Sequence, residues 1–400
     1  MHIDADLHIH SRFSGGTSPK MTVQRLATAA QQKGIHLLGT GDCLHPVWRE
    51  ELGQEGDMNN GVITVGDTSF VLTTEIEDSN RVHHLILFPS WQAVDDFAAQ
   101  IAPAAAALDT AGRPHVATSG ATIADMAHDA GALIGPAHAF TPWTAMYAYH
   151  DSIRDCYDGA TVDFLELGLS ADSDYADTID ELHHLPFLSN SDSHSPYPIR
   201  LAREFNRLDI QAVTWDEIRS ALLHRAGRSI VLNVGFPPGE GKYNRTACTA
   251  CYRQYDIDAA RKRNWRCGCG GRIKKGVRDR IDELASHGEV RHPEHRPPYL
   301  HLLPLAEIIG AALRFSPRSK TVQRRWTHLM DHFGSEIAVL IDADSEDIQQ
   351  VASPAVASAI TAFRSGAITI HPGGGGKYGE LELPRAGSET KNQRRLPEWN

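Results

Sequence analysis

Short apolar runs alternate with helical patterns over residues 1–232. Seven of these runs have the alternating or continuous hydrophobicity that is typical of β-strands. They are Ile3–His10, His36–Thr40, Ser69–Glu75, His83–Phe88, Leu133–Pro136, Val162–Leu167 and Leu185–Ser189. Met21–Lys33 and Ala121–Ala130, which lie between runs, have helical patterns. Alternation of strands and helices predicts an α/β domain with parallel strands, either a barrel or a doubly wound sheet.

Side chains that can bind metal ions lie near the ends of these runs. His8 and His10 end the first run and project from one face, because residues i and i+2 of a strand do so. Asp192 and His194 repeat this spacing after the seventh run. Further candidates near run ends are Asp42, His45, Glu75, His84 and His138. In a barrel the strand ends meet at one face, where active sites are built, so the pattern predicts a metal centre.

Three of these candidates have simpler explanations. Asp42 could cap the helix that follows it, a role that Asp favours. His138 could be a packed loop histidine, and Glu75 could belong to solvated surface charge. The apolar residues directly before Glu75 favour a place at the mouth of the barrel.

The distribution of charge indicates a second, basic part of the chain. The chain has 400 residues and a net charge of −11, yet Lys242–Arg280 contains twelve Lys and Arg against three Asp. This asymmetry predicts a basic binding segment attached to an acidic body. No apolar run approaches the ~20 residues that span a bilayer. The N-terminus lacks a signal-peptide pattern, so we expect a cytoplasmic location.

Four cysteines fall within the basic segment. Cys248-x2-Cys251 is followed after fifteen residues by Cys267-x-Cys269, close to zinc-ribbon spacing. Four thiolates suit a closed tetrahedral zinc site, which predicts one structural zinc. Cys43 and Cys156 are solitary, and we interpret them as small buried residues.

Basic and aromatic residues alternate through and around this segment. Basic side chains neutralise phosphates and aromatic rings stack on bases. The predicted DNA-binding residues are Lys242, Tyr243, Arg272, Lys274, Lys275 and Lys377. Pro238–Tyr243 and Pro372–Gly379 are similar glycine-rich turns, each with Lys-Tyr. They could approach a phosphate closely, or they could be ordinary flexible loops.

The patterns divide the chain into four parts. Residues 1–232 are the predicted barrel, 233–295 the zinc-binding domain, 296–384 a helical DNA-binding domain and 385–400 a disordered tail. The predicted C-terminal helices are Leu303–Leu313, Val322–Phe333 and Ala355–Phe363. Residues 334–360 resemble a helix-hairpin-helix, but Ala352-Ser353-Pro354 replaces its glycine-rich hairpin.

The barrel motifs resemble the PHP (polymerase and histidinol phosphatase) superfamily. They are Asp6-Leu7-His8-Ile9-His10, Gly41-Asp42, Glu75, His84-Leu85-Ile86-Leu87, Pro136-Ala137-His138 and Asp192-Ser193-His194. The resemblance implies a distorted parallel (β/α)7-type barrel that hydrolyses phosphoesters with about two or three divalent ions. These ions are zinc, with manganese, magnesium or iron as alternatives.

The same resemblance implies a ligand set. His8, His10, Glu75 and Asp192 hold one metal, and Glu75 bridges to a second held by His84 and His138. His84 is preferred to His83 because it directly precedes Leu-Ile-Leu. A third metal uses His194 with Asp42 or His45. Gly41-Asp42 departs from the usual Thr-Asp-His triplet, so the ligands of the third metal stay open.

The order of the parts resembles the endonuclease Q family. Gly135–Trp143, Gly270–Val277 and Pro372–Gly379 are the stretches that carry this resemblance. It implies an enzyme that nicks DNA on the 5′ side of deaminated bases (hypoxanthine, uracil, xanthine) or abasic sites. Glu75, Asp192 and His194 are then the expected catalytic residues.

Some functional assignments stay open. Ser170 and Asn190 lie beside metal-bearing strand ends, so they are candidate residues for a base pocket. The alternative functions are a PHP small-molecule phosphatase and a DNA-binding adaptor with an inactive barrel. The expected partner is damaged DNA. A sliding clamp is a further candidate, although no clear clamp-binding peptide is evident.

Overall fold

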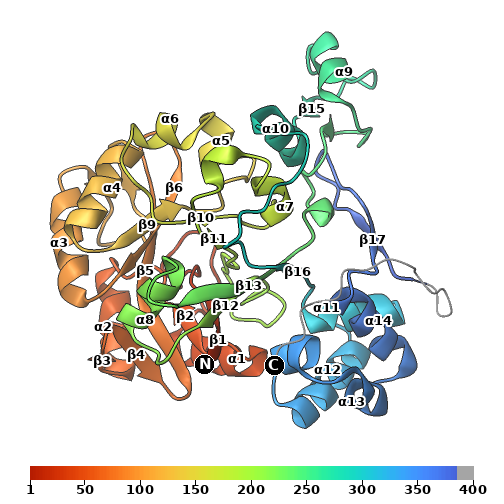
Figure 1. The fold of residues 1–400 in the computed structure, drawn as a ribbon, viewed down its shortest axis with the longest axis horizontal. Coiled ribbons are helices and arrows are strands. Elements are labelled where there is room, and N and C mark those ends of the chain that lie inside the picture. The colour runs from red at the N-terminus through yellow and green to blue at the C-terminus, as the bar shows by residue number, and fades with distance from the viewer. Residues whose placement is uncertain (385–400) are drawn as a thin grey trace.

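The computed structural model describes residues 1–384, and the predicted tail 385–400 lies outside the described residues. Seven strands form a closed barrel (Figure 1), and each overlaps one of the seven predicted runs. They are β1 (His2–Asp6), β2 (Leu37–Gly39), β5 (Thr68–Glu77), β6 (His83–Phe88), β9 (Leu133–Pro136), β10 (Leu165–Glu166) and β11 (Phe187–Leu188). The predicted α/β class is therefore confirmed.

Hydrogen bonds connect neighbouring strands around the ring. β1 pairs with β2, β2 with β5, and β10 with β11, all in parallel. Between β9 and β10, the amide of Asp163 donates to the carbonyl of Ile134 at 2.8 Å. The ring closes where the amide of His10 donates to the carbonyl of Ser193 at 3.0 Å.

Strand β6 runs against both of its neighbours, β5 and β9. Only residues 78–82 connect β5 to β6, whereas a parallel crossover needs about a dozen residues or more. The short loop therefore forces a hairpin. As a result, the start of β6 lies at the same rim as the C-terminal ends of β1, β2 and β5.

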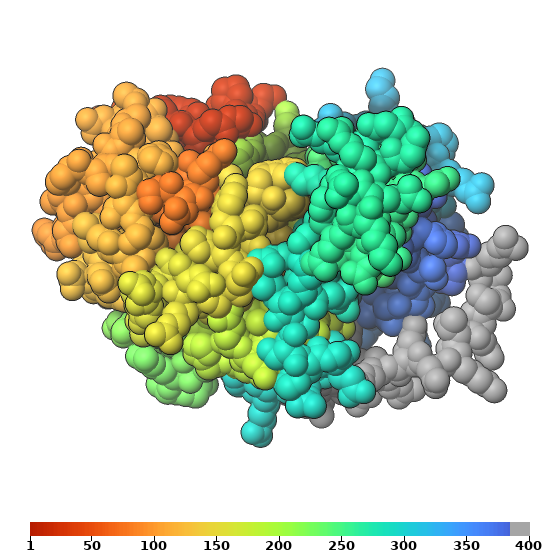
Figure 2. All heavy atoms as spheres, turned by 90° about the horizontal axis from the view of Figure 1, so that it is seen from above, coloured from red at the N-terminus to blue at the C-terminus, as the bar shows by residue number. Residues whose placement is uncertain are grey.

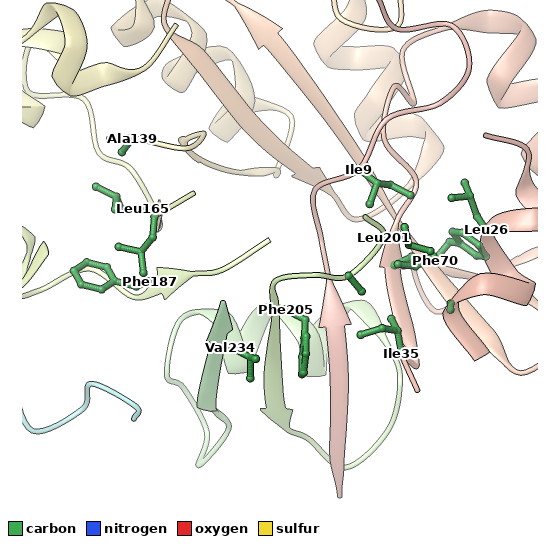
Figure 3. Packing of buried hydrophobic residues seen from close by; sticks show 14 of the residues in the cluster. Ile9, Leu26, Ile35, Phe70, Ala139, Leu165, Phe187, Leu201, Phe205 and Val234 are labelled. Carbon is green, nitrogen blue, oxygen red and sulfur yellow. The ribbon is translucent and has the colours of Figure 1, made fainter. Parts of the chain in front are cut away.

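Helices cover the barrel from outside. They include α1 (Val23–Lys33), α2 (Pro46–Glu55), α3 (Trp91–Ile101), α4 (Gly120–Asp129) and α8 (Trp215–Leu222). Because strand side chains alternate between two faces, the buried residues form two clusters. Ile3, Ala5 and Leu7 pack with α8, whereas Phe70 and Leu72 pack with α1 to α4. Figure 3 shows Leu26 of α1 beside Phe70 of β5.

Further elements extend the barrel sheet and connect its strands. β12 and β13 continue it antiparallel from β1, β16 adds a parallel strand, and β4 and β3 extend it from β5. The bounds are β3 (Met58–Asn59), β4 (Val62–Val65), β7 (Ala105–Ala106), β8 (His115–Val116), α5 (Met146–Tyr149), α6 (Ile153–Tyr157), α7 (Ser173–Ala176), η1 (Asp180–Leu182), β12 (Phe205–Asp209), β13 (Ser229–Gly235) and β16 (Tyr299–His301).

The four-cysteine segment projects from the barrel at the upper right of Figure 1. It contains η2 (Pro238–Glu240), β14 (Ala247–Cys248), α9 (Ile257–Lys262), β15 (Ile273–Lys274) and α10 (Val277–Leu284). The four cysteine sulfurs lie within 4.8 Å of one another, and none forms a disulfide. Its own buried cluster has four residues, two of them cysteines. So small a core needs a metal to be stable, which fits the predicted structural zinc.

The C-terminal helices pack beside the barrel. They are α11 (Leu305–Leu313), α12 (Lys320–Phe333), η3 (Ala338–Asp342), α13 (Ser345–Val351) and α14 (Pro354–Arg364). A buried ion pair of 2.7 Å joins Lys33 of α1 to Glu336. Glu336 also accepts hydrogen bonds from the Trp326 indole and the Leu305 amide, so one buried carboxylate connects the barrel to these helices. None of the described helices is long and apolar enough to cross a membrane.

The two similar glycine-rich turns lie against each other. After α14, the hairpin of β17 (Thr369–His371) and β18 (Glu380–Glu382) returns toward the four-cysteine segment (Figure 1). The amide of Gly373 donates to the carbonyl of Gly239, and that of Gly376 to Lys242, at 2.9 and 2.8 Å. A Cβ on Gly373 would lie 2.7 Å from the carbonyl oxygen of Gly241 in the first turn. The turns therefore form one packed unit, contrary to the flexible-loop alternative.

Candidate metal centre and adjoining cavities

Two buried histidines follow β1 at the barrel rim. His8 and His10 are 1% and 0% exposed. Nδ1 of His8 lies 2.9 Å from Glu166, and Nδ1 of His10 lies 3.1 Å from Asp42. Such carboxylates fix the tautomer and leave Nε2 free to bind a metal. Nε2 of His8 has no hydrogen-bond partner within residues 1–384, which is unusual for a buried nitrogen and fits a ligand.

Potential ligand atoms gather in three overlapping groups. The groups are His8, His10 and Glu75; His10, Asp192 and His194; and Glu75, His83 and His138. Within each group the atoms lie within 4.8 Å of one another. Glu75 and His10 each belong to two groups, so the predicted bridging role of Glu75 fits the geometry. Mixed imidazole and carboxylate donors suit zinc, manganese or iron, so the residues fit the implied metals.

The charges in this pocket are strongly coupled. Burial raises the pKa of Glu75, but His83, His10 and His138 outweigh it and hold that pKa well below its usual range. Burial lowers the pKa of His8, but Glu166, Glu75 and Asp192 raise it to about 9. The pocket is thus arranged to hold positive charge, either as protons on imidazoles or as bound cations.

The prediction of His84 as a ligand is wrong in this geometry. Nδ1 of His83 lies 2.7 Å from Glu75 and 3.3 Å from Nε2 of His138. Nδ1 of His84 instead lies 2.8 Å from the hydroxyl of Tyr157, and its Nε2 lies 3.3 Å from Asp78. Consecutive residues of a strand face opposite sides, so only one of the pair can reach the cluster.

Asp42 and His45 do not join any of the three groups. The Asp42 carboxylate accepts hydrogen bonds from His10, from the amide and hydroxyl of Ser11, and from the hydroxyl of Ser14. It therefore orients His10. His45 caps α2 and stacks on Phe13 with ring centroids 4.0 Å apart. The candidate group that contains His194 in this geometry consists of His10, Asp192 and His194, without Asp42 or His45.

Two residues in contact with the cluster had no role assigned from the sequence. Glu166 ends β10; besides His8, it accepts from the amide of His138 at 2.7 Å. Its position after a strand run was a usable signal. Arg113 donates to Glu75 at 2.9 Å, and its side chain is 29% exposed. It lies in the irregular segment between β7 and β8, where no periodic pattern distinguishes it.

A cavity of about 200 Å³ opens beside His138. Thr141 lines it, and its hydroxyl lies 3.1 Å from Nδ1 of His138. Other lining residues are Pro142, Trp143, Leu169, Ser170, Pro238, Gly241, Lys242, Tyr243, Asn244 and Tyr378. The wall therefore combines barrel loops with both glycine-rich turns. The predicted residue Ser170 lines this cavity.

Asn190 does not line this cavity. It is 1% exposed, and its carbonyl oxygen accepts from the amide of Leu7 and the side chain of Asn206. Its amide nitrogen donates to Glu166 at 2.8 Å. Because these bonds occupy the side chain, Asn190 supports the frame behind His8, and its assignment to a base pocket is corrected.

Two of the other predicted DNA-binding residues line a neighbouring cavity, and two are exposed elsewhere on the segment and the second turn. Lys274 and Lys275 line a second cavity of about 280 Å³, which shares Thr141 and Pro142 with the first. Figure 2 shows the four-cysteine segment over this face, next to the barrel loops around residue 140. Arg272 is exposed, and Lys377 is exposed and paired with Glu380 at 2.8 Å.

Comparisons with known structures give two matches over nearly the whole chain. One is the novel lesion-specific endonuclease PfuEndoQ from Pyrococcus furiosus, at 48% identity, a TM-score of 0.94 and 96% coverage of both chains. The other is an endonuclease Q complex with a 27-mer duplex substrate carrying an abasic lesion at the active site. It matches at 48% identity and a TM-score of 0.90, over 96% of this chain and 97% of that chain.

Two curated relatives are uncharacterised proteins. YqxK of Bacillus subtilis is 34% identical over 95% of this chain and 99% of its own length. MJ0043 of Methanocaldococcus jannaschii is 46% identical over 62% of this chain, but that match spans only 31% of MJ0043. A family model described as the MJ0043 C-terminal domain matches residues 304–367, the region of the C-terminal helices.

The barrel, the clustered ligands and these matches define the class as DNA endonuclease. Within that class, the chain belongs to the endonuclease Q family.

The geometry around Glu75 predicts which of the adjacent histidines holds metal. We expect His83→Asn to lower the metal content of purified protein by about one ion per chain, because it removes one donor of a group. His84→Asn should retain the wild-type content, since His84 faces Tyr157. Elemental analysis of folded protein by mass spectrometry measures both.

Proposed function

We propose that this chain is a metal-dependent endonuclease that cuts DNA on the 5′ side of a lesion. The proposed lesions are deaminated bases (hypoxanthine, uracil and xanthine) and abasic sites, each extruded from the helix. The single observation that carries this proposal is the cavity of about 200 Å³ whose lining residue Thr141 contacts His138. It provides space for an extruded nucleotide next to the ligand groups.

The barrel residues have complementary roles in this reaction. Divalent ions held by these groups would activate water and neutralise charge on the scissile phosphodiester. Glu75 would supply carboxylate oxygens to two of these groups, and Asp192 with His194 would supply donors to the third. Burial and the neighbouring His10 lower the pKa of His194, so its imidazole is neutral near pH 7 and can act as a ligand or accept a proton.

Arg113 is the protein cation closest to this chemistry. Its guanidinium contacts Glu75, and neighbouring carboxylates raise its pKa although burial lowers it. A permanent positive charge at the rim can hold a phosphate oxygen. We propose that Arg113 binds the phosphodiester that is cut.

Base selection follows from hydrogen-bond polarity in the cavity. Deamination replaces an exocyclic amino donor with a carbonyl acceptor. A wall that offers only N–H donors, such as the Lys242 ammonium, pairs with such an acceptor, whereas an amino group would leave a donor facing a donor. An unpaired buried polar group costs about 1–3 kcal/mol. Extrusion costs a few kcal/mol and is easiest at a mispaired or missing base.

The basic segment argues against the two alternative functions. A small-molecule phosphatase does not require Lys242 and Tyr243 in the wall of the cavity. An adaptor with an inactive barrel does not require three intact groups of ligand atoms.

We further propose that the four cysteines hold one structural zinc. Nothing in residues 1–384 or in the comparisons supports a sliding clamp as partner.

The proposal predicts a nick next to the lesion. Duplexes with one uracil, hypoxanthine, xanthine or abasic site should be cut at the phosphodiester 5′ of the lesion in the presence of a divalent ion. Gel mapping of an end-labelled strand locates the cut. An undamaged duplex of the same sequence is the control. Equal cutting of both, or cutting only on the 3′ side, contradicts the proposal.

The role of Arg113 predicts a large kinetic effect from a single substitution. Arg113→Ala should lower kcat/KM for an abasic duplex by about 100-fold, the range typical of lost transition-state electrostatics. Arg113→Lys should recover part of it, because the charge returns. Arg49→Ala is the matched control, since Arg49 forms an ion pair with Asp95 on α3, away from the cluster. Equal rates for Arg113→Ala and wild type contradict this role.

A further inference from the structure

Lys274 has an unusual setting for a lysine on a nucleic-acid-binding surface. Its Nζ lies 4.2 Å from the ring centroid of Trp143 and 5.2 Å from that of Tyr243. These two rings meet edge to face with centroids 5.0 Å apart. Within the described residues, no carboxylate forms an ion pair with Lys274. The amine is therefore held between aromatic faces without a counter-charge.

Nearby lysines have other environments. Lys275 pairs with Glu283 at 2.6 Å, and Lys377 pairs with Glu380 at 2.8 Å. The carboxylate of Glu380 raises the pKa of Lys377 and so favours its charged form. Lys242 lies farther from its aromatic neighbours, at 5.5 Å from Tyr243 and 5.9 Å from Tyr378. Lys274 is thus the amine most closely enclosed by rings in this group.

Enclosure between rings affects the chemistry of the amine. Burial lowers the pKa of Lys274, because removal of water disfavours the ammonium form. Neutral lysine amines are nucleophiles that react with carbonyl groups.

The position of Lys274 relative to the cavity indicates which carbonyl group could reach its amine. Trp143 and Tyr243, the two rings that enclose the amine, both line the cavity proposed to receive the lesion. Thr141, which contacts His138, lines this cavity and also the cavity that Lys274 lines. An abasic nucleotide extruded here would bring its sugar, with no base attached, next to this wall. Its ring-opened form has an aldehyde at C1′.

We propose a further activity: Lys274 condenses with the C1′ aldehyde of a ring-opened abasic site to form an imine. This inference rests on the proposed function, because it requires that the cavity receive an abasic nucleotide. The lone pair of Nζ attacks C1′, and one amine proton moves to the carbonyl oxygen. The C1′–O bond then breaks, and the oxygen leaves as water with the second amine proton. No oxidant or reductant takes part, and water reverses the step.

The imine can be trapped with borohydride, which reduces it to a stable secondary amine. The probe is a duplex with one natural abasic site, labelled at the 3′ end of the lesion strand. A cut on the 5′ side leaves the abasic sugar on the labelled fragment, so trapping is detected whether or not the strand is cut. Wild-type protein should give a labelled covalent complex, and peptide mass spectrometry should place the adduct on Lys274.

Two controls isolate the chemistry. A duplex with a tetrahydrofuran site has no C1′ hydroxyl, cannot open to an aldehyde and should give no complex. Lys274→Arg keeps the positive charge but removes the nucleophile, so the trapped fraction per bound complex should fall by about tenfold or more. Binding is measured separately by fluorescence anisotropy. Lys262→Arg, an exposed residue of the same segment, should trap as wild type does.

The outcomes separate the inference from the proposed function. Nicking of lesion duplexes without a trapped complex overturns the imine, and an adduct on Lys242 or Lys275 overturns its assignment to Lys274; both results leave the endonuclease proposal intact. Absence of nicking on every lesion duplex overturns the proposed function itself. Equal trapping by Lys274→Arg and wild type also overturns the assignment to Lys274.

Discussion

The negative charge of one buried carboxylate must be compensated, and the rest of the site depends on this requirement. Glu75 is 1% exposed and lies within ion-pair distance of His10, His83, His138 and Arg113. An isolated charge at this depth would be very costly. The compensating groups come from the segment after β1, from β6, from the loop after β9 and from the loop before β8. The closed barrel is what brings these distant segments to one point.

A second set of carboxylates keeps the imidazoles in place. Glu166 and Asp42 contact Nδ1 of His8 and His10, and so direct each Nε2 toward the cluster. The loop after β10 approaches His138 so closely that a Cβ at Gly168 would lie 2.6 Å from Cβ of His138. Gly168 also has a φ of +70°, which glycine adopts without strain. This approach brings Ser170 to the cavity.

The sequence predicted the barrel well because its strands are short, apolar and separated by helical patterns. Each predicted run overlaps a strand of the ring. The choice between His83 and His84 could not be made from alternation alone. A shift of one residue in the register of a strand turns every side chain to the opposite face. Asp42 could not be assigned from the sequence, because a carboxylate that orients a histidine and one that binds metal have the same sequence pattern. His45 could not be assigned either, because its hydrogen bond with the Trp48 amide at the start of α2 is visible only in the structure. Arg113 contacts the cluster from an irregular segment, and only tertiary structure shows this.

The cavity beside the cluster depends on residues that no single domain contains. Its wall needs Trp143 and Ser170 from barrel loops, Tyr243 from the first glycine-rich turn and Tyr378 from the second. The amide of Gly376 donates to Lys242, so the second turn supports the first. The cysteine segment carries Lys274 on β15, which pairs with β14. The barrel alone holds the three candidate groups of imidazole and carboxylate ligands, whereas the cavity exists only when the cysteine segment and the C-terminal turn pack against it.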